Sequence, residues 1–168
     1  MRKTDIKWGD NTIELAGNEV KVGQKAPDFV LTGNDMKPIT LKDTTGKVRI
    51  FSALPSLDTA VCDKETRRFN EEAAKIPGVE IWTVSMDLPF AQKRWCAAAG
   101  ISAVKTASDY KKASFGENWG VLEPGRHLHV RAVFVVDKDD TVKYVEYVPI
   151  IASEPNYDAA IAAAKALT

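Results

Sequence analysis

The chain has 168 residues, of which 45% are hydrophobic and 27% charged, a composition that excludes a fibrous or largely disordered protein and suits one domain over residues 1–168. Lysine plus arginine and aspartate plus glutamate number 23 each, without a stretch of one sign, which argues against binding to nucleic acid or to an anionic membrane. No run approaches ~18 apolar residues and none follows the basic N-terminus, so we expect no membrane span or signal peptide and a cytoplasmic location.

The N-terminal part of the chain predicts strands. Apolar residues alternate at Ile6, Trp8, Ile13 and Leu15 around the turn residues 9–11, a pattern typical of a β-hairpin. Further strands are expected at Ala26 to Leu31 and at Val48 to Leu54, because polar, glycine-containing turns separate these apolar runs.

The middle of the chain alternates between helix and strand. Small or apolar residues recur at intervals of three and four from Cys62 to Ile76, which predicts a helix that stops before Pro77. A strand follows over Val79 to Met86. A second helix is predicted after this strand. Asp87 is its expected N-cap, Pro89 is expected in its first turn, and Gly100 is expected to end it.

The last third of the chain predicts shorter elements. We expect a strand at 104–107, a short helix at 110–115, a loop at 116–130, a hairpin formed by 131–136 and 142–148, and a final helix at 159–167. This order of elements predicts an α/β fold, with a mixed central sheet flanked by helices on both faces and an N-terminal β-hairpin extension.

The two cysteines carry the question of function. Disulfides are rare in a reducing compartment, so two cysteines there are more often reactive or metal-binding than structural. Cys62 follows a strand and three N-cap residue types, Ser56, Asp58 and Thr59, which the sequence does not distinguish as the cap. A helix that begins in this turn places Cys62 where unpaired N–H groups and the helix dipole favour the negatively charged thiolate.

Each of these residues also has a purely structural alternative. Cys62 could serve simply as a small apolar residue on a buried helix face. Thr59 could serve only as a helix cap, although its spacing from Cys62 would also let its hydroxyl face the sulfur or hold a substrate oxygen. Arg131 interrupts the apolar strand 130–136, where a guanidinium needs an anion unless its head reaches water. Cys96, considered without any family resemblance, is interpreted as a residue packed within a helix.

The remaining polar and aromatic residues are interpreted as structural. His127 and His129 alternate faces of a strand and lack zinc-site spacing, so we expect no metal, and no glycine-rich phosphate loop indicates a cofactor. The carboxylates and tryptophans are interpreted as caps, solvated faces or core; they are Asp58, Asp63, Glu65, Asp87, Trp8, Trp82, Trp95 and Trp119.

Several stretches of the sequence resemble one protein family. Residues 55–62, PSLDTAVC, match the P-x-x-x-T-x-x-C active-site motif of the peroxiredoxins. The longer stretches PSLDTAVCDKETRRFN, SMDLPFAQKRWCAAAG, RAVFVVDKDD and EPNYDAA resemble the bacterial thiol peroxidase subfamily, which are atypical two-cysteine peroxiredoxins. The likeness extends over nearly the whole chain and implies a thioredoxin-like fold.

The resemblance also implies a role for each matching residue. Cys62 would be the peroxidatic cysteine and Cys96 the resolving one, with Pro55, Thr59 and Arg131 completing the peroxide pocket. It implies reduction of organic hydroperoxides and hydrogen peroxide, an intramolecular Cys62–Cys96 disulfide, thioredoxin as electron donor and a homodimer. Residues 63–65, Asp-Lys-Glu, differ from the smaller residues of many members, and such charges would bear on access or donor docking.

Two other functions compete with this interpretation. A thioredoxin-like disulfide oxidoreductase normally carries its redox pair as C-x-x-C, whereas Cys62 is followed by charged residues and no nearby cysteine. A redox-sensing interaction protein would undergo stoichiometric oxidation without sustained loss of peroxide.

Overall fold

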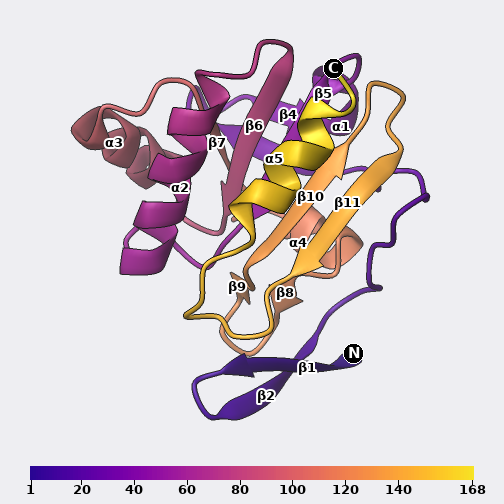
Figure 1. Ribbon diagram of the computed structural model, residues 1–168. Coiled ribbons are helices and arrows are strands. Elements are labelled where there is room, and N and C mark those ends of the chain that lie inside the picture. Colours follow the sequence, from indigo (N-terminus) through magenta and orange to yellow (C-terminus); the bar gives the residue numbers. More distant parts are fainter.

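A seven-stranded mixed sheet forms the centre of the computed structural model, which describes residues 1–168 (Figure 1). Its strand order is β11-β10-β5-β6-β7-β3-β4. The inner strands β5, β6 and β7 are parallel to one another, and the strands on either side of them are antiparallel to their neighbours. The expected mixed sheet with a thioredoxin-like order of elements is therefore confirmed.

The elements have the following bounds. The strands are β1 Arg2–Trp8, β2 Asn11–Leu15, β3 Val30–Gly33, β4 Pro38–Thr40, β5 Val48–Ala53, β6 Val79–Ser85, β7 Lys105–Ser108, β8 Leu122–Glu123, β9 Leu128–His129, β10 Ala132–Val136 and β11 Val142–Tyr147. The helices are α1 Leu41–Thr44, α2 Ala60–Ala73, α3 Pro89–Ala99, α4 Ser114–Asn118 and α5 Tyr157–Lys165. No helix combines the length and apolar character needed to cross a bilayer.

Two apolar cores lie on opposite faces of the sheet. Phe69 of α2 and Ile161 of α5 pack against Ile50 and Val133 of the sheet, with α2 and α5 in front of it in Figure 1. The other face packs against aromatic side chains from α4 and its neighbours, Phe29, Phe115 and Trp119 among them. Helices thus cover both faces, as the alternating sequence pattern predicts.

Several expected elements differ from those observed. The predicted strand at 26–31 is instead Val30–Gly33, and β4, α1, β8 and β9 were not expected. The predicted helix at 110–115 is wrong: α4 begins at Ser114, because the Asp109 carboxylate accepts the backbone N–H groups of Phe115 and Gly116 and fixes the helix start there.

Asp87 is not the N-cap of α3, a role that Leu88 takes without a side-chain bond. The Asp87 carboxylate instead accepts hydrogen bonds from the Ser56 hydroxyl at 2.6 Å, the Leu57 N–H at 2.9 Å and the Ser85 hydroxyl at 2.7 Å. Asp87 therefore ties the loop before α2 to the end of β6.

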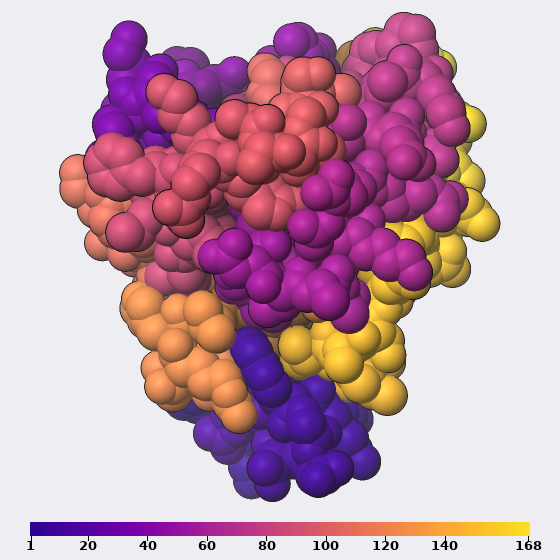
Figure 2. All heavy atoms as spheres, turned by 90° about the vertical axis from the view of Figure 1, so that its left-hand side faces the viewer, coloured from indigo at the N-terminus to yellow at the C-terminus, as the bar shows by residue number.

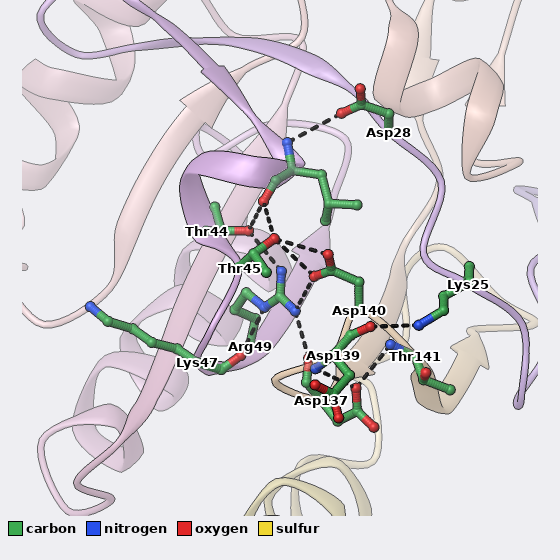
Figure 3. Close-up of polar contacts among 11 residues, drawn as sticks. Lys25, Asp28, Thr44, Thr45, Lys47, Arg49, Asp137, Asp139, Asp140 and Thr141 are labelled. Carbon is green, nitrogen blue, oxygen red and sulfur yellow. Dashed lines mark hydrogen bonds and ion pairs between the residues drawn. The ribbon is translucent and has the colours of Figure 1, made fainter.

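Two arginines are buried at opposite ends of the β5–β10 pair. Arg49, at the start of β5, is fully buried and donates to the Asp140 carboxylate, the Asp137 carbonyl and the Thr44 hydroxyl (Figure 3). These oxygen acceptors hold the β10–β11 turn against α1 and β5. Arg131, just before β10, lies at the other end and has different partners.

Candidate active site

Cys62 lies in the first turn of α2, the helix that follows the C-terminal end of β5 along the chain. Thr59 is the N-cap residue, and the first helical hydrogen bond runs from the Asp63 N–H to the Thr59 carbonyl at 2.9 Å. The N–H groups that precede this bond are the unpaired donors of a helix N-terminus, which favour negative charge nearby. The sequence-based placement of Cys62 at a helix start is confirmed.

The Cys62 side chain is fully buried and packs with Leu54, Leu57 and Trp95. Its one polar side-chain contact is with Arg131, whose Nη1 lies 3.4 Å from the sulfur. The sulfur is thus enclosed by apolar side chains but in contact with a permanent positive charge. A guanidinium at this distance is placed to interact with negative charge that develops at the sulfur during a reaction.

Arg131 is held in place by a carbonyl and a carboxylate. Its Nε and Nη2 both donate to the Ile151 carbonyl, at 3.1 and 2.9 Å, and its Nη1 donates to Glu65 Oε2 at 2.5 Å. The residue is 2% exposed, so the alternative of a strand-end arginine with its head in water is wrong. The guanidinium therefore has a fixed orientation relative to the sulfur.

Glu65 was expected on a solvated face and is instead fully buried between Ser52 of β5 and Arg131, the residue before β10. Its Oε1 accepts the Ser52 hydroxyl at 2.8 Å, while its Oε2 accepts from Arg131. Burial raises the pKa of Glu65 to about 7, and the attraction of Arg131 and the Ser52 hydrogen bond limit that rise. Glu65 and Cys62 contact the same guanidinium nitrogen, Nη1 of Arg131.

A cavity of about 260 Å³ adjoins this cluster. Pro55, Thr59 and Arg131 all line it, so three of the expected site residues meet in one wall; the other lining residues are Trp8, Gly9, Ala60, Val61, Ile151 and Ala152. Cys62 does not line the cavity, but its contact Arg131 does. The Thr59 hydroxyl donates to the Ser56 carbonyl at 2.9 Å rather than to the sulfur.

Cys96 lies away from this cluster, in the last turn of α3. Its sulfur is 3.8 Å from the Thr106 hydroxyl, and it lines a separate cavity of about 400 Å³ beside β7. Burial raises the pKa of the Cys96 thiol, which the Thr106 hydroxyl partly offsets. Both cysteines are free thiols, and the fold does not bring them together.

The comparisons with known proteins agree with this geometry. The Redoxin family profile matches residues 21–161. The thiol peroxidase of Halalkalibacterium halodurans is 55% identical over 96% of this chain and 97% of its own length, and that of Bacillus subtilis is 50% identical over 97% and 98%. A peroxiredoxin-like protein from Aquifex aeolicus superposes over 100% of both chains with a TM-score of 0.92 and 40% identity.

A thioredoxin-like sheet with a buried, arginine-contacted cysteine at the start of its first crossover helix defines a thiol-dependent redox enzyme. The chain belongs to the redoxin family and, within it, to the bacterial thiol peroxidases. It is accordingly a thiol-dependent peroxidase, an oxidoreductase.

Glu65 generates a prediction about pH. Its pKa of about 7 lies above the usual 4.5, so the folded chain keeps a proton that the unfolded chain releases. The resulting stability is fully present below about pH 4.5 and is lost as the pH rises through about 7, by at most about 3 kcal/mol. Glu65→Gln, which retains an acceptor for Arg131, should lose less stability than the wild type between about pH 5 and about pH 8.

Urea unfolding at both pH values measures this difference, with Glu71→Gln, an exposed glutamate of the same helix, as the matched control. The control should follow the wild type. Equal losses of stability in Glu65→Gln and the wild type would contradict the assignment of a buried, proton-holding Glu65.

Proposed function

We propose that the protein reduces organic hydroperoxides and hydrogen peroxide at Cys62, that Cys96 resolves the oxidised cysteine, and that thioredoxin restores both thiols. The observation that carries this proposal is the 3.4 Å contact between the Arg131 guanidinium and the buried Cys62 sulfur, beside a cavity that Arg131 also lines. Pro55 and Thr59 complete the peroxide pocket.

In the first step, the Cys62 thiolate attacks the terminal oxygen of the hydroperoxide. A sulfur–oxygen bond forms as the oxygen–oxygen bond breaks, Cys62 is oxidised to a sulfenic acid, and the departing oxyanion takes a proton to leave as an alcohol or as water. Arg131 and the first-turn N–H groups of α2 stabilise the charge along the breaking bond. The Thr59 hydroxyl, which donates to the Ser56 carbonyl, retains lone pairs that can accept a hydrogen bond from the hydroperoxide O–H.

Pro55 has a shielding role in this step. Pro55 is buried and lines the cavity, just before the loop that Asp87 holds. As a proline it has no backbone N–H, so it offers no donor that would compete for the substrate oxygens. Because the sulfur itself is fully buried, a substrate reaches it from the cavity only when the first turn of α2 yields slightly. The sulfur itself is therefore shielded from bulk water.

In the second step, the Cys96 thiol condenses with the Cys62 sulfenic acid, releasing water and forming an intramolecular disulfide. Cys62 is in the first turn of α2 and Cys96 in the last turn of α3, and these helices follow successive parallel strands. The rise of ~1.5 Å per residue from Pro89 to Cys96 alone separates them by about 10 Å, whereas a disulfide needs Cα atoms within about 7 Å. One or both segments must therefore unwind.

The α3 segment is built to unwind at low cost. Only Pro89 and Gln92 of this helix are buried. Trp95 packs against Cys62 and donates its indole N–H to Asp63 Oδ2 at 3.2 Å, so it connects the two cysteine segments in the reduced protein. A segment with few buried contacts opens more readily than the core. Unwinding also exposes Cys96, which removes the burial that raises the pKa of its thiol.

The disulfide is then reduced by thiol exchange with thioredoxin. We propose that residues 1–168 act as one domain in the cytoplasm, where a reducing environment agrees with the two free thiols. We also propose a homodimer, because Leu88 and Phe90, 51% and 68% exposed, present apolar surface at the start of α3.

Substitution of each cysteine separates their roles. Cys62→Ser should abolish NADPH consumption in an assay coupled through thioredoxin reductase and thioredoxin to cumene hydroperoxide, because the nucleophile is lost. Cys96→Ser should consume about one equivalent of peroxide and then stop, because thioredoxin finds no disulfide to reduce. Activity that survives in Cys62→Ser would remove the assigned nucleophile, and full turnover in Cys96→Ser would remove the resolving role.

Oxidation should also change backbone protection in the two cysteine segments. Amide hydrogen exchange of the disulfide form should be faster than in the reduced form at the start of α2, at the end of α3, or at both, and unchanged in β5 and β10. Cys96→Ser treated with the same peroxide is the control, since it forms no intramolecular disulfide. Equal protection of both segments in the reduced and oxidised wild type would rule out the proposed unwinding.

A further inference from the structure

The N-terminal hairpin reaches the peroxide pocket through its turn. Trp8 ends β1, and both Trp8 and Gly9 line the 260 Å³ cavity together with Pro55, Ala60 and Val61 of the cysteine segment. Figure 2 shows this face of the molecule, where the hairpin in indigo, the segment around residue 150 in yellow and the start of α2 in purple meet. A segment outside the central sheet therefore contributes to the wall of the active site.

Backbone hydrogen bonds dock the hairpin at this position. The Lys7 N–H donates to the Pro149 carbonyl at 2.8 Å, and the Ile151 N–H donates to the Lys7 carbonyl at 3.1 Å. Ile151 also holds the Arg131 guanidinium through its own carbonyl. The residue before Trp8 is thus paired with the residue that orients Arg131, which fixes the hairpin relative to the reacting sulfur.

The indole ring of Trp8 is itself held in place. The Arg126 guanidinium lies 4.7 Å from the ring centroid, and Arg126 is paired with the Glu123 carboxylate at 3.4 Å. Trp8 also packs against the large apolar core that includes Ile6, Ile13 and Ile151. A ring held by a cation and by core side chains provides a rigid apolar surface at little cost in conformational entropy.

The cavity is larger than the oxidising group requires. The two reacting oxygens of a peroxide occupy only the end of the cavity beside Arg131. Hydrogen peroxide, which has no other heavy atoms, would therefore leave most of the 260 Å³ unfilled. We infer that Trp8 is a specificity-determining residue, whose side chain contacts the hydrocarbon group of a bulky organic hydroperoxide while Arg131 and Thr59 hold its oxygens. This inference rests on the proposed peroxidase site and adds a residue from outside the cysteine motif.

The contact has a measurable consequence for substrate choice. An apolar group that gains contact with Trp8 raises kcat/KM for its hydroperoxide, whereas hydrogen peroxide has no such group. Trp8→Ala should therefore lower the ratio of kcat/KM for cumene hydroperoxide to that for hydrogen peroxide about tenfold. Trp8→Phe, which restores an aromatic wall, should recover most of that ratio.

The experiment measures Cys62 oxidation by each peroxide in wild type, Trp8→Ala and Trp8→Phe, with Trp82→Phe as the matched control. Trp82 lines the separate cavity beside Cys96, so its substitution should leave the ratio unchanged. An unchanged ratio in Trp8→Ala, or an equal fall for both peroxides, would overturn the inference. Failure of the wild type to react with either peroxide would instead overturn the proposed function.

Discussion

The site depends on one buried cation that is shared among unlike acceptors. Arg131 gives two donors to the Ile151 carbonyl, and its Nη1 contacts both the Glu65 carboxylate and the Cys62 sulfur. Arg49, at the other end of the same strand pair, contacts oxygen acceptors alone and holds a turn (Figure 3). Hydrogen bonds offset the cost of burying both arginines, but only Arg131 contacts a cysteine sulfur, that of the proposed nucleophile.

This arrangement explains why the site draws on so many segments of the chain. A guanidinium in a dry site needs acceptors on several sides. These are the Glu65 carboxylate of α2, which the Ser52 hydroxyl of β5 holds in turn, and the Ile151 carbonyl after β11. Ile151 in turn is paired with Lys7 of the hairpin. The active site is therefore a closed structure, and the proposed mechanism alternates it with an opened α2–α3 region in which Cys96 reaches Cys62.

The sequence predicts the parts of this picture that depend on local pattern. Strand–helix alternation gives the sheet, and the residues before Cys62 give the helix start. Glu65 was misassigned because a glutamate on a helix is usually solvated; its three-residue spacing from Cys62 places both on one face, which was the available signal. Asp87 was misassigned because its partners, Ser56 and Leu57, lie on a distant loop.

Trp8 shows a different limit of sequence reasoning. Alternation predicts its place in the hairpin, but its contribution to the cavity depends on the pairing of Lys7 with the chain near Pro149, a contact between the two ends of the sequence. Likewise, the acceptors of Arg131 include a backbone carbonyl, which no residue type reveals. Local pattern locates the nucleophile, whereas tertiary pairing determines what surrounds it.

The rate of Cys62 oxidation in Arg131→Lys tests the central claim most directly. Stopped-flow measurement under single-turnover conditions should show a fall of roughly 100-fold in the second-order rate constant, because an ammonium lacks the planar donors that contact the sulfur, Glu65 and Ile151 together. Arg49→Lys, a buried arginine away from the sulfur, should lose stability but keep the rate. A rate in folded Arg131→Lys within about twofold of the wild type would contradict the account.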